Sequence, residues 1–355
     1  MKVCVLGEGG REHALAWAAD KFGHEVVVVP GNAGNPWSST VEPVDADLYV
    51  LGSDEVVCSG QGDRLRRRGH LVFGPNADGG QLEGSKQWMK ELLVAGGIPT
   101  ARHATCTSIE KAEAFLRTLP GGYVVKTDYL ALGKGVLVTD DIDEAIGDAR
   151  AKLDHGAVVI EERLEGVEFS LLAVCDGHQA VLLPPAMDHK RIFNGDTGPN
   201  TGGMGAVSPV PRLSQETIQD AFDRCVQPTL AALRARGIDY RGVLYGGPIM
   251  LTADGPRVVE WNARWGDPEA QVLLPLFESD PYEIEGVSAA RALADVEIFS
   301  AGVGPGPTTA GGRVLNVTGL GADVNQARAR AYEAVSMIGW PGMQYRQDIG
   351  LSALT

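Results

Sequence analysis

The sequence predicts an α/β protein composed of several lobes. A buried strand at residues 2–6 runs into a glycine turn and then a helical stretch, which is typical of the start of a parallel α/β lobe. Later segments alternate apolar and polar residues, as half-buried strands do. With 355 residues the chain is too long for one small core and suits two or three lobes.

Composition narrows the class of protein. Apolar residues make up 44% of the chain, and the formal net charge of −15 argues against a nucleic acid or a membrane surface as the main partner. The five cysteines are scattered and form no CxxC pair, which fits a reducing compartment. No apolar run approaches the roughly 18–20 residues of a membrane span. These features predict a cytoplasmic protein.

The glycine turn after the first strand is a candidate phosphate site. Gly9 and Gly10 place backbone N–H groups at the start of a helix, where an anion is favoured, and Arg11 adds a positive charge. The dinucleotide pattern GxGxxG is incomplete, because Glu12 stands where its third glycine would be. NAD is therefore not expected.

Short apolar runs at 48–51 and 71–73 continue this parallel lobe. Only about a dozen residues separate Gly34 from Leu48, which is barely enough for a helical crossover. The lobe is therefore predicted to be trimmed.

The middle of the chain combines a helix that begins at Lys86 with two strands, 123–128 and 136–138, joined by a glycine loop. Gly133 and Gly135 allow backbone to lie close over a ligand, and Lys134 supplies charge at the tip of the loop. The Walker pattern GxxxxGK[ST] is absent, and an isolated Gly-Lys-Gly is also common in ordinary turns.

The next segments predict a helix at 141–153, a strand at 157–166, and two strands between 169 and 185 that continue an antiparallel sheet. Residues 186–209 are rich in glycine and varied polar residues and have little apolar periodicity. Long loops of this kind are usually functional or disordered. We expect a structureless loop that a ligand orders.

A long helix is predicted at 215–236, and a small C-terminal α/β piece combines a strand near 313–317 with a helix near 323–337. Residues 280–309 are rich in Gly, Pro and Ala and predict little regular structure.

The stretch 258–269, VVEWNARWGDPE, contains a candidate metal site. Side chains two apart on a strand share a face, so Glu260 and Asn262 point the same way, opposite Val259 and Trp261. A carboxylate and an amide oxygen suit Mg²⁺, which takes oxygen ligands. The same pattern is also typical of an edge strand with a solvated polar face.

Several segments together indicate a family. They are GEGGREHALAW, PGNAGNPW, FGPNADGGQLEGSK, VVKTDYLALGKGV, VVIEERLEG, DHKRIFNGDTGPNTGGMGAVSP and VVEWNARWGDPEAQ. In this order, and over nearly the whole chain, they resemble the phosphoribosylamine–glycine ligases of the ATP-grasp superfamily. The GDTGPNTGGMGAxSP and N-x-R-x-GDPE motifs are specific to that family, whereas the glycine turns alone are not.

The resemblance implies an α/β fold with an α+β ATP-grasp core. It implies a small N-terminal parallel α/β substrate lobe at 1–80, a two-lobed ATP-grasp core at 81–280, and a trimmed C-terminal α/β lobe at 281–355. Family members bind ATP between two sheet lobes. The resemblance leaves the oligomeric state open between monomer and dimer.

The resemblance also implies site residues. The ATP-binding residues that it implies are Lys86, Lys126, Gly133, Gly135, Glu161, Glu162, Leu164 and Glu168. The substrate-binding residues that it implies are Gly9, Gly10, Arg11, Asn32, Asp196, Thr197, Gly198 and Arg264. Arg264, Lys134 and Asp196 are the catalytic candidates. Glu260 and Asn262 match the Mg²⁺ ligands, with Mn²⁺ as an alternative cation.

The implied reaction belongs to purine biosynthesis. The carboxylate of glycine attacks the γ-phosphate of ATP to form glycyl phosphate, and the amine of phosphoribosylamine then displaces phosphate to give glycinamide ribonucleotide. Phosphoryl transfer depends mainly on positioning and charge neutralisation, which lysines, Mg²⁺ and backbone N–H groups provide.

The sequence departs from the family pattern in places. The chain is shorter than family members usually are, Gly52-Ser53-Asp54 replaces Gly-Pro-Glu, and Asp128-Tyr129-Leu130 replaces Asp-Gly-Leu. The changes lie mostly on the amine-substrate side, so we expect a higher Michaelis constant for phosphoribosylamine. Two alternatives are a ligase that acts on another amine and a non-catalytic nucleotide-binding relative.

Overall fold

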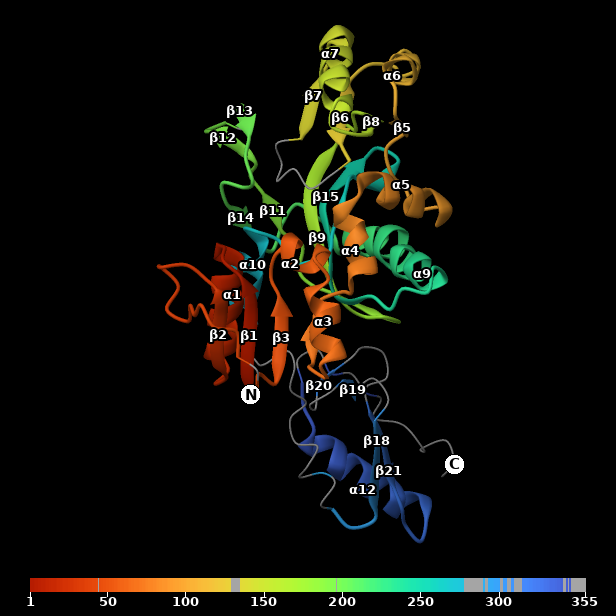
Figure 1. Ribbon diagram of the computed structural model, residues 1–355. Coiled ribbons are helices and arrows are strands. Elements are labelled where there is room, and N and C mark those ends of the chain that lie inside the picture. Colours follow the sequence, from red (N-terminus) through yellow and green to blue (C-terminus); the bar gives the residue numbers. More distant parts are fainter. Residues whose placement is uncertain are drawn as a thin grey trace. The chain divides into compact units, whose positions relative to one another are not determined.

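A computed structural model describes residues 1–43, 45–128, 135–195 and 197–277, together with 290, 293–300, 303–304, 308–309, 315–340, 343 and 345. The chain forms two compact units, Met1–Pro275 and Leu276–Thr355 (Figure 1). The division into lobes at residues 80 and 280 stays a prediction. No helix in the described part of the chain is long and apolar enough to cross a membrane.

The N-terminal lobe is a parallel sheet with the strand order β2-β1-β3-β4. Its strands are β1 (Lys2–Gly7), β2 (Glu25–Pro30), β3 (Leu48–Leu51) and β4 (Val72–Phe73). The predicted parallel lobe is confirmed. Between β2 and β3 the described residues contain no helix, and the loop is tied to the sheet through a bridge between Val28 and Ser38. The crossover is therefore as short as the sequence predicted.

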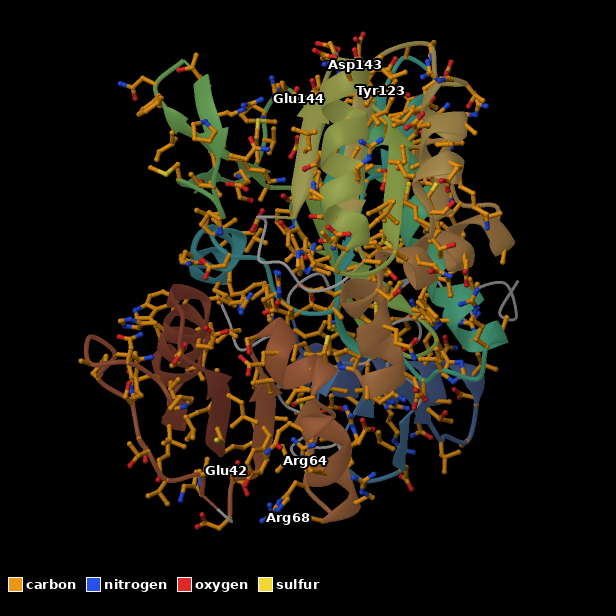
Figure 2. The ribbon with its side chains drawn as sticks, turned by 45° about the horizontal axis from the view of Figure 1, so that its top comes forward. Glu42, Arg64, Arg68, Tyr123, Asp143 and Glu144 are labelled. Atoms are coloured by element: carbon orange, nitrogen blue, oxygen red, sulfur yellow. The ribbon has the colours of Figure 1, made fainter. Side chains whose placement is uncertain are left out.

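Four helices accompany this sheet. They are α1 (Gly10–Lys21), α2 (Asp54–Cys58), α3 (Gln61–Arg67) and α4 (Ala77–Gly84). The sequence indicated α1 but not the other three. Ser53 and Asn76 cap α2 and α4, each accepting a hydrogen bond from a backbone N–H of the first turn. At the end of α3, Arg68 lies 4.0 Å from Glu42 of the β2–β3 loop (Figure 2).

A second lobe contains an antiparallel sheet with the order β5-β8-β6-β7. Its strands are β5 (His103–Cys106), β6 (Tyr123–Thr127), β7 (Val136–Thr139) and β8 (Val158–Glu162), and its helices are α6 (Ile109–Leu116) and α7 (Ile142–Leu153). Val125 and Ile160 are fully buried in its core. Tyr123 and the first turn of α7, which carries Asp143 and Glu144, lie at one end of this lobe (Figure 2).

A third sheet has the order β10-β9-β15-β16, and β17 also pairs with β15. Its strands are β9 (Val167–Asp176), β10 (Ala180–Leu182), β15 (Arg241–Thr252), β16 (Gly255–Val258) and β17 (Trp261–Asn262). We expected the strand at 157–166 and those after it to form one antiparallel sheet, and this was wrong. The chain changes sheets after β8, and Gly166 approaches the backbone of Leu251 too closely for a side chain.

The predicted strand through 258–262 is interrupted. β16 and β17 pair with β15 in one continuous register, with Val258 opposite Ile249 and Trp261 opposite Gly246. The interruption faces Pro248 of β15, which has no N–H to donate to the ladder. The two short strands therefore behave as one strand with a gap at residues 259–260.

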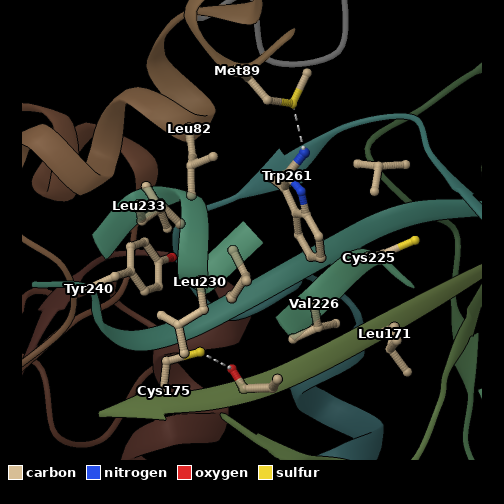
Figure 3. Close-up of a cluster of buried hydrophobic side chains, with 14 of the residues drawn as sticks. Leu82, Met89, Leu171, Cys175, Cys225, Val226, Leu230, Leu233, Tyr240 and Trp261 are labelled. Carbon is tan, nitrogen blue, oxygen red and sulfur yellow. Dashed lines mark hydrogen bonds between the residues drawn. The ribbon is translucent and has the colours of Figure 1, made fainter. Parts of the chain in front are cut away.

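Helices cover the third sheet and close its core. α5 (Lys86–Ala95) packs against α9 (Gln227–Ala235), and the backbone N–H of Trp261 donates to Met89 Sδ over 3.2 Å (Figure 3). The predicted helix at 215–236 consists of α8 (Gln215–Ala221), a π-helical turn η1 (Phe222–Val226) and α9. The wider turn immediately precedes Pro228, which cannot donate a helical hydrogen bond.

The glycine-rich segment 186–209 is not structureless, contrary to the prediction. It contains β11 (Met187–Asp188), β12 (Arg191–Phe193), β13 (Thr197–Asn200) and β14 (Ala206–Val207). β12 pairs with β13 inside a wider pairing of β11 with β14, so the segment forms nested hairpins. Local backbone pairing gives it structure without the apolar periodicity that would have revealed it.

The first unit ends with α10 (Glu269–Leu273) and the short helix η2 (Leu274–Leu276), which extends into the second unit. The second unit contains β18 (Val296–Ser300), β19 (Val303–Gly304), β20 (Thr308–Thr309), β21 (Leu315–Gly319) and α12 (Val324–Met337). β18 pairs with β21 and β19 with β20, both antiparallel. The predicted strand and helix are present, and β18, β19 and β20 lie in the range 280–309 that was expected to have little regular structure.

Gly166→Ala should destabilise the protein, because the new methyl group would overlap the carbonyl of Leu251 where the chain passes between sheets. We expect a loss of about 1–3 kcal/mol in the free energy of unfolding. The matched control is Gly147→Ala in the exposed interior of α7, where nothing lies within 4 Å, and this should gain about 0.5–1 kcal/mol. Guanidinium denaturation measures both, and equal effects would contradict the close approach.

Candidate active site

The first turn of α5 is held against the end of β6 by one carboxylate. Asp128 accepts hydrogen bonds from the Ser85 hydroxyl at 3.1 Å and from the backbone N–H of Gln87 at 2.8 Å. Lys86 lies between these two donors in the sequence and Lys126 lies two residues before Asp128. Asp128 therefore positions both lysines relative to each other. Burial lowers the pKa of Lys86, a shift that the nearby carboxylate of Glu260 opposes.

A buried ion cluster, Lys90–Glu161–Lys126, lies behind these lysines. In the register of β6 and β8, Val124 faces Glu161, so Lys126 is the diagonal neighbour of Glu161 on the same face. Lys126 Nζ is 2.8 Å from Glu161 Oε1, and Lys90 Nζ is 3.0 Å from Glu161 Oε2. All three side chains are at least 96% buried.

The protonation of the cluster follows from burial and charge. Burial alone raises the pKa of Glu161, but the two ammonium groups outweigh it and lower the pKa to about 2. Burial lowers the pKa of Lys90 to about 8 against the opposing attraction of Glu161. The cluster thus pairs one carboxylate with two ammonium groups.

A second group of charges surrounds Glu260, which is half-buried. Lys190 Nζ donates to Glu168 Oε1 over 2.6 Å. Burial lowers the pKa of Lys190, but Glu168 and Glu260 outweigh it and raise the pKa above its ordinary value. The charge of Glu260 thus acts on both Lys86, at the start of α5, and Lys190, between β11 and β12.

Asn262 and Arg264 form part of one buried network. The Arg264 guanidinium is 2.7 Å from Glu83 Oε1 and donates to Asn262 Oδ1 over 3.2 Å. Glu83 also accepts the backbone N–H of Ala263 at 2.9 Å, and it lies in α4 of the preceding segment. Arg264 Nε is buried and has no hydrogen-bond partner. Glu83 therefore holds the guanidinium in a fixed orientation with one donor left over.

Acidic side chains lie beneath the nested hairpins. Glu269 Oε1 accepts the hydroxyls of Ser170 at 2.8 Å and Tyr245 at 2.6 Å, and the side chain is fully buried. Burial, with the negative charge of Glu269 adding to it, raises the pKa of Asp188 to about 6. Asp188 is in β11 and lies beside Gly203, and Pro268, which precedes α10, also lies close to Gly203.

The glycine turn of the N-terminal lobe faces the start of α10, and α1 and α10 lie side by side (Figure 1). The backbone N–H of Gly9 donates to Glu12 over 2.6 Å. Arg11 is buried and donates to Glu12 and, over 3.3 Å, to the carbonyl of Trp265. Asn32 donates to the carbonyl of Glu8 over 2.7 Å. The turn and the residues after Arg264 are thus held together.

The remaining predicted residues occupy several places. Glu162 accepts the backbone N–H of Arg102 at 2.9 Å, and Leu164 follows it in the segment between β8 and β9. Thr197 and Gly198 begin β13 in the hairpins, and the carbonyl of Gly135 accepts from Thr127. The predictions for Gly133, Lys134 and Asp196 lie outside the described residues.

The described residues include no group of three or more His, Cys, Asp or Glu side chains that could hold a metal. Glu260 and Asn262 offer one carboxylate and one amide oxygen. Such a pair fits Mg²⁺, which usually keeps waters and phosphate oxygens and needs few protein ligands. The residues present therefore fit this cation better than a metal that needs a closed protein cage.

Three participants were missed from the sequence: Lys90, Glu83 and Asp188. Lys86 and Lys90 are four residues apart and so share a helix face, which was a usable signal. For the two carboxylates the sequence contained no comparable signal, because the hydrogen-bond partner of Glu83 is 180 residues away and Asp188 belongs to a segment read as loop.

Comparison with known protein families identifies the family to which this chain belongs. Models of the phosphoribosylglycinamide synthetase N domain, ATP-grasp (A) domain and C domain match residues 1–83, 84–270 and 275–352. The chain belongs to the phosphoribosylglycinamide synthetase family. The resemblance inferred from the motifs is confirmed.

Relatives extend the match over the whole chain. A phosphoribosylamine–glycine ligase from Leifsonia xyli is 39% identical over 418 residues, covering 99% of this chain and 100% of that protein. The trifunctional purine biosynthetic protein adenosine-3 of Gallus gallus is 38% identical and is covered over 42% of its length. The 418-residue alignment is longer than the 355-residue chain, so this family member lacks residues inside the aligned span.

Solved structures confirm the fold. The phosphoribosylamine–glycine ligase from Thermotoga maritima is 34% identical with a TM-score of 0.70, covering 98% of this chain and 100% of that one. The N5-carboxyaminoimidazole synthetase from Staphylococcus aureus, solved with ADP, has a TM-score of 0.58 at 16% identity over 75% of this chain. The latter likeness concerns the fold alone.

Glu161→Gln should destabilise the protein at neutral pH, because two buried ammonium groups lose their counter-ion. We expect a loss of about 3–5 kcal/mol at pH 7. The pKa of Glu161 is lowered from 4.5 to about 2 in the folded protein, so its stabilising charge is fully present above pH 4.5 and is lost as pH falls toward 2.

The difference in stability between wild type and Glu161→Gln, measured by denaturant midpoints, should therefore narrow as pH falls from 4.5 toward 2. Glu165→Gln, at a side chain that is 85% exposed, is the matched control and should change little. A variant as stable as the wild type at pH 7 would contradict the account of the cluster.

Proposed function

We propose that this protein joins glycine to 5-phosphoribosylamine with consumption of ATP. A carboxylate oxygen of glycine attacks the γ-phosphorus of ATP, the bond to the β,γ-bridging oxygen breaks, and ADP leaves. The amine of phosphoribosylamine then attacks the acyl carbon of glycyl phosphate, phosphate leaves, and a proton is released from nitrogen. The proposal rests on the observation that this chain, a member of the family, carries a set of cationic and oxygen-donor side chains.

The nucleotide side of the proposal uses Lys86 and Lys126. Asp128 and Glu161 hold these lysines in place before any ligand arrives. Preorganised positive charge stabilises the oxygens of a transferring phosphoryl group without reorganisation during the reaction. Gly133, Gly135, Glu162, Leu164 and Glu168 complete the proposed nucleotide site, in which Glu168 would bind ribose.

Glu260 and Asn262 are the proposed Mg²⁺ ligands, with Mn²⁺ as an alternative. The cation would neutralise phosphate charge beside these two side chains. The chain's own contribution is orientation, since Arg264 donates to Asn262 Oδ1 and fixes which way the amide points.

The proposed substrate side joins two lobes. Arg264 would bind the glycine carboxylate, with Thr197 and Gly198 of β13 and also Asp196 as further substrate-binding residues. Gly9, Gly10, Arg11 and Asn32 would bind the phosphoribosylamine. This division is supported by the position of the glycine turn, which faces Asp267 and Gln271 a few residues beyond Arg264. We propose the cytoplasm as the location, with a monomer or a dimer as the assembly.

Mass detection of the product tests the function. Purified protein is incubated with ATP, Mg²⁺, glycine and freshly generated phosphoribosylamine, and glycinamide ribonucleotide and ADP are quantified together. Equal amounts of both products are expected. ADP release that depends on glycine but not on phosphoribosylamine would favour a ligase for another amine, and no ADP release would favour a non-catalytic relative.

Glu260→Gln should lower turnover by about a hundredfold or more at saturating Mg²⁺, because one charged ligand is lost where phosphate charge must be neutralised. The exposed Glu216→Gln on α8 removes the same charge elsewhere and is the matched control. Steady-state rates and a denaturant midpoint are measured for both. Near-normal turnover of the Glu260→Gln variant would show that Glu260 is not a metal ligand.

Lys126→Ala and Lys134→Ala should affect different quantities, ATP affinity in the first case and kcat in the second. Lys126 lies in β6 and is positioned in advance, so its removal should weaken ATP binding itself. Lys134 belongs to the segment predicted as a mobile loop, so its removal should mainly reduce kcat. Calorimetric ATP affinity and kcat separate the two effects, and equal losses of affinity would disprove the distinction.

A further inference from the structure

Lys90 is the one member of the ion cluster that no motif assigned to the nucleotide site. It lies on the buried face of α5, and its side chain is 1% exposed. Its ammonium group donates to Thr100 Oγ1 at 2.7 Å, to Glu161 Oε2 at 3.0 Å and to the carbonyl of Val259 at 3.4 Å. All three protons are used, and the contacts join α5, β8 and the residue before Glu260.

The two carboxylate oxygens of Glu161 are divided between the two lysines. Each carboxylate oxygen faces one ammonium group, Oε2 toward Lys90 and Oε1 toward Lys126. The cluster has a formal charge of +1, so one positive charge is not compensated within it. Without Lys90, both oxygens of Glu161 would act on Lys126 alone, and the net charge would be zero.

We infer that Lys90 is a positioning residue that shares the charge of Glu161 and thereby leaves the charge of Lys126 available to the phosphates of a nucleotide. The inference rests on the proposed function in so far as Lys126 binds nucleotide phosphate. It adds a third lysine, one that touches no ligand itself, to the determinants of nucleotide affinity.

The inference predicts that affinity for phosphate, rather than for the nucleoside, follows the net charge of the cluster. The ratio of the dissociation constants for adenosine and ADP measures the phosphate contribution. Lys90→Met brings the cluster to zero charge, and we expect the ratio to fall about tenfold, with adenosine affinity unchanged. Lys90→Met/Glu161→Gln returns the cluster to +1, and we expect the ratio to return to the wild-type value.

Titration calorimetry of the full chain with adenosine and with ADP provides the measurement. Lys111→Met, at an exposed lysine on α6, removes the same charge away from the cluster and should leave the ratio unchanged. A purely structural role would lower the affinities for adenosine and ADP together, which would overturn the inference. An unchanged ratio in Lys90→Met would also overturn it.

Two further results have a defined interpretation. If Lys90→Met does not fold, the double variant is compared with the wild type alone, and a tenfold lower ratio in it contradicts charge sharing. If the wild type binds no ADP, the nucleotide part of the proposed function fails, and this is distinct from failure of the role of Lys90.

Discussion

The arrangement of the nucleotide side depends on one buried carboxylate, Glu161. It lies in β8, one residue from the end of that strand, and its two oxygens bind lysines from β6 and α5. A buried ion of either sign is costly unless it is paired, so Glu161 stabilises both lysines in their charged forms. This requirement fixes α5 against the second lobe and sets the position of Lys126. The same helix carries Lys86 at its first turn, which Asp128 holds through the Ser85 hydroxyl and the backbone N–H of Gln87.

A parallel constraint operates on the substrate side. Glu83, in α4, binds Arg264 and accepts the backbone N–H of Ala263. Arg264 in turn donates to Asn262 Oδ1 and so determines the orientation of the Asn262 amide. Between β16 and β17 the backbone N–H of Val259 donates to the carbonyl of Pro248 over 3.3 Å, and Glu260 follows Val259 in this gap. Lysines and carboxylates from separate lobes thus converge on the same few residues of one chain segment, which is what transfer of a phosphoryl group between two bound substrates requires.

Much of the fold could be predicted from the sequence, because the strands of the parallel lobe are continuous apolar runs bounded by turns. The family motifs likewise made the candidate residues visible. Lys90 was missed because a lysine in an amphipathic helix is ordinarily exposed, and only the position of Glu161 explains its burial. The nested hairpins were missed because their strands are short and mostly exposed, so burial imposes no alternation on their sequence. The break at Pro248 depends on a pairing partner that local sequence does not identify.

The most direct test of this account is a crystal structure of the protein with Mg²⁺ and a non-hydrolysable ATP analogue. The account predicts that Lys86 and Lys126 lie within hydrogen-bonding distance of phosphate oxygens. It also predicts that the cation is bound by Glu260 and Asn262, and that Glu161 remains between Lys90 and Lys126. A nucleotide whose phosphates lie away from both lysines, or a cation held by other residues, would contradict it.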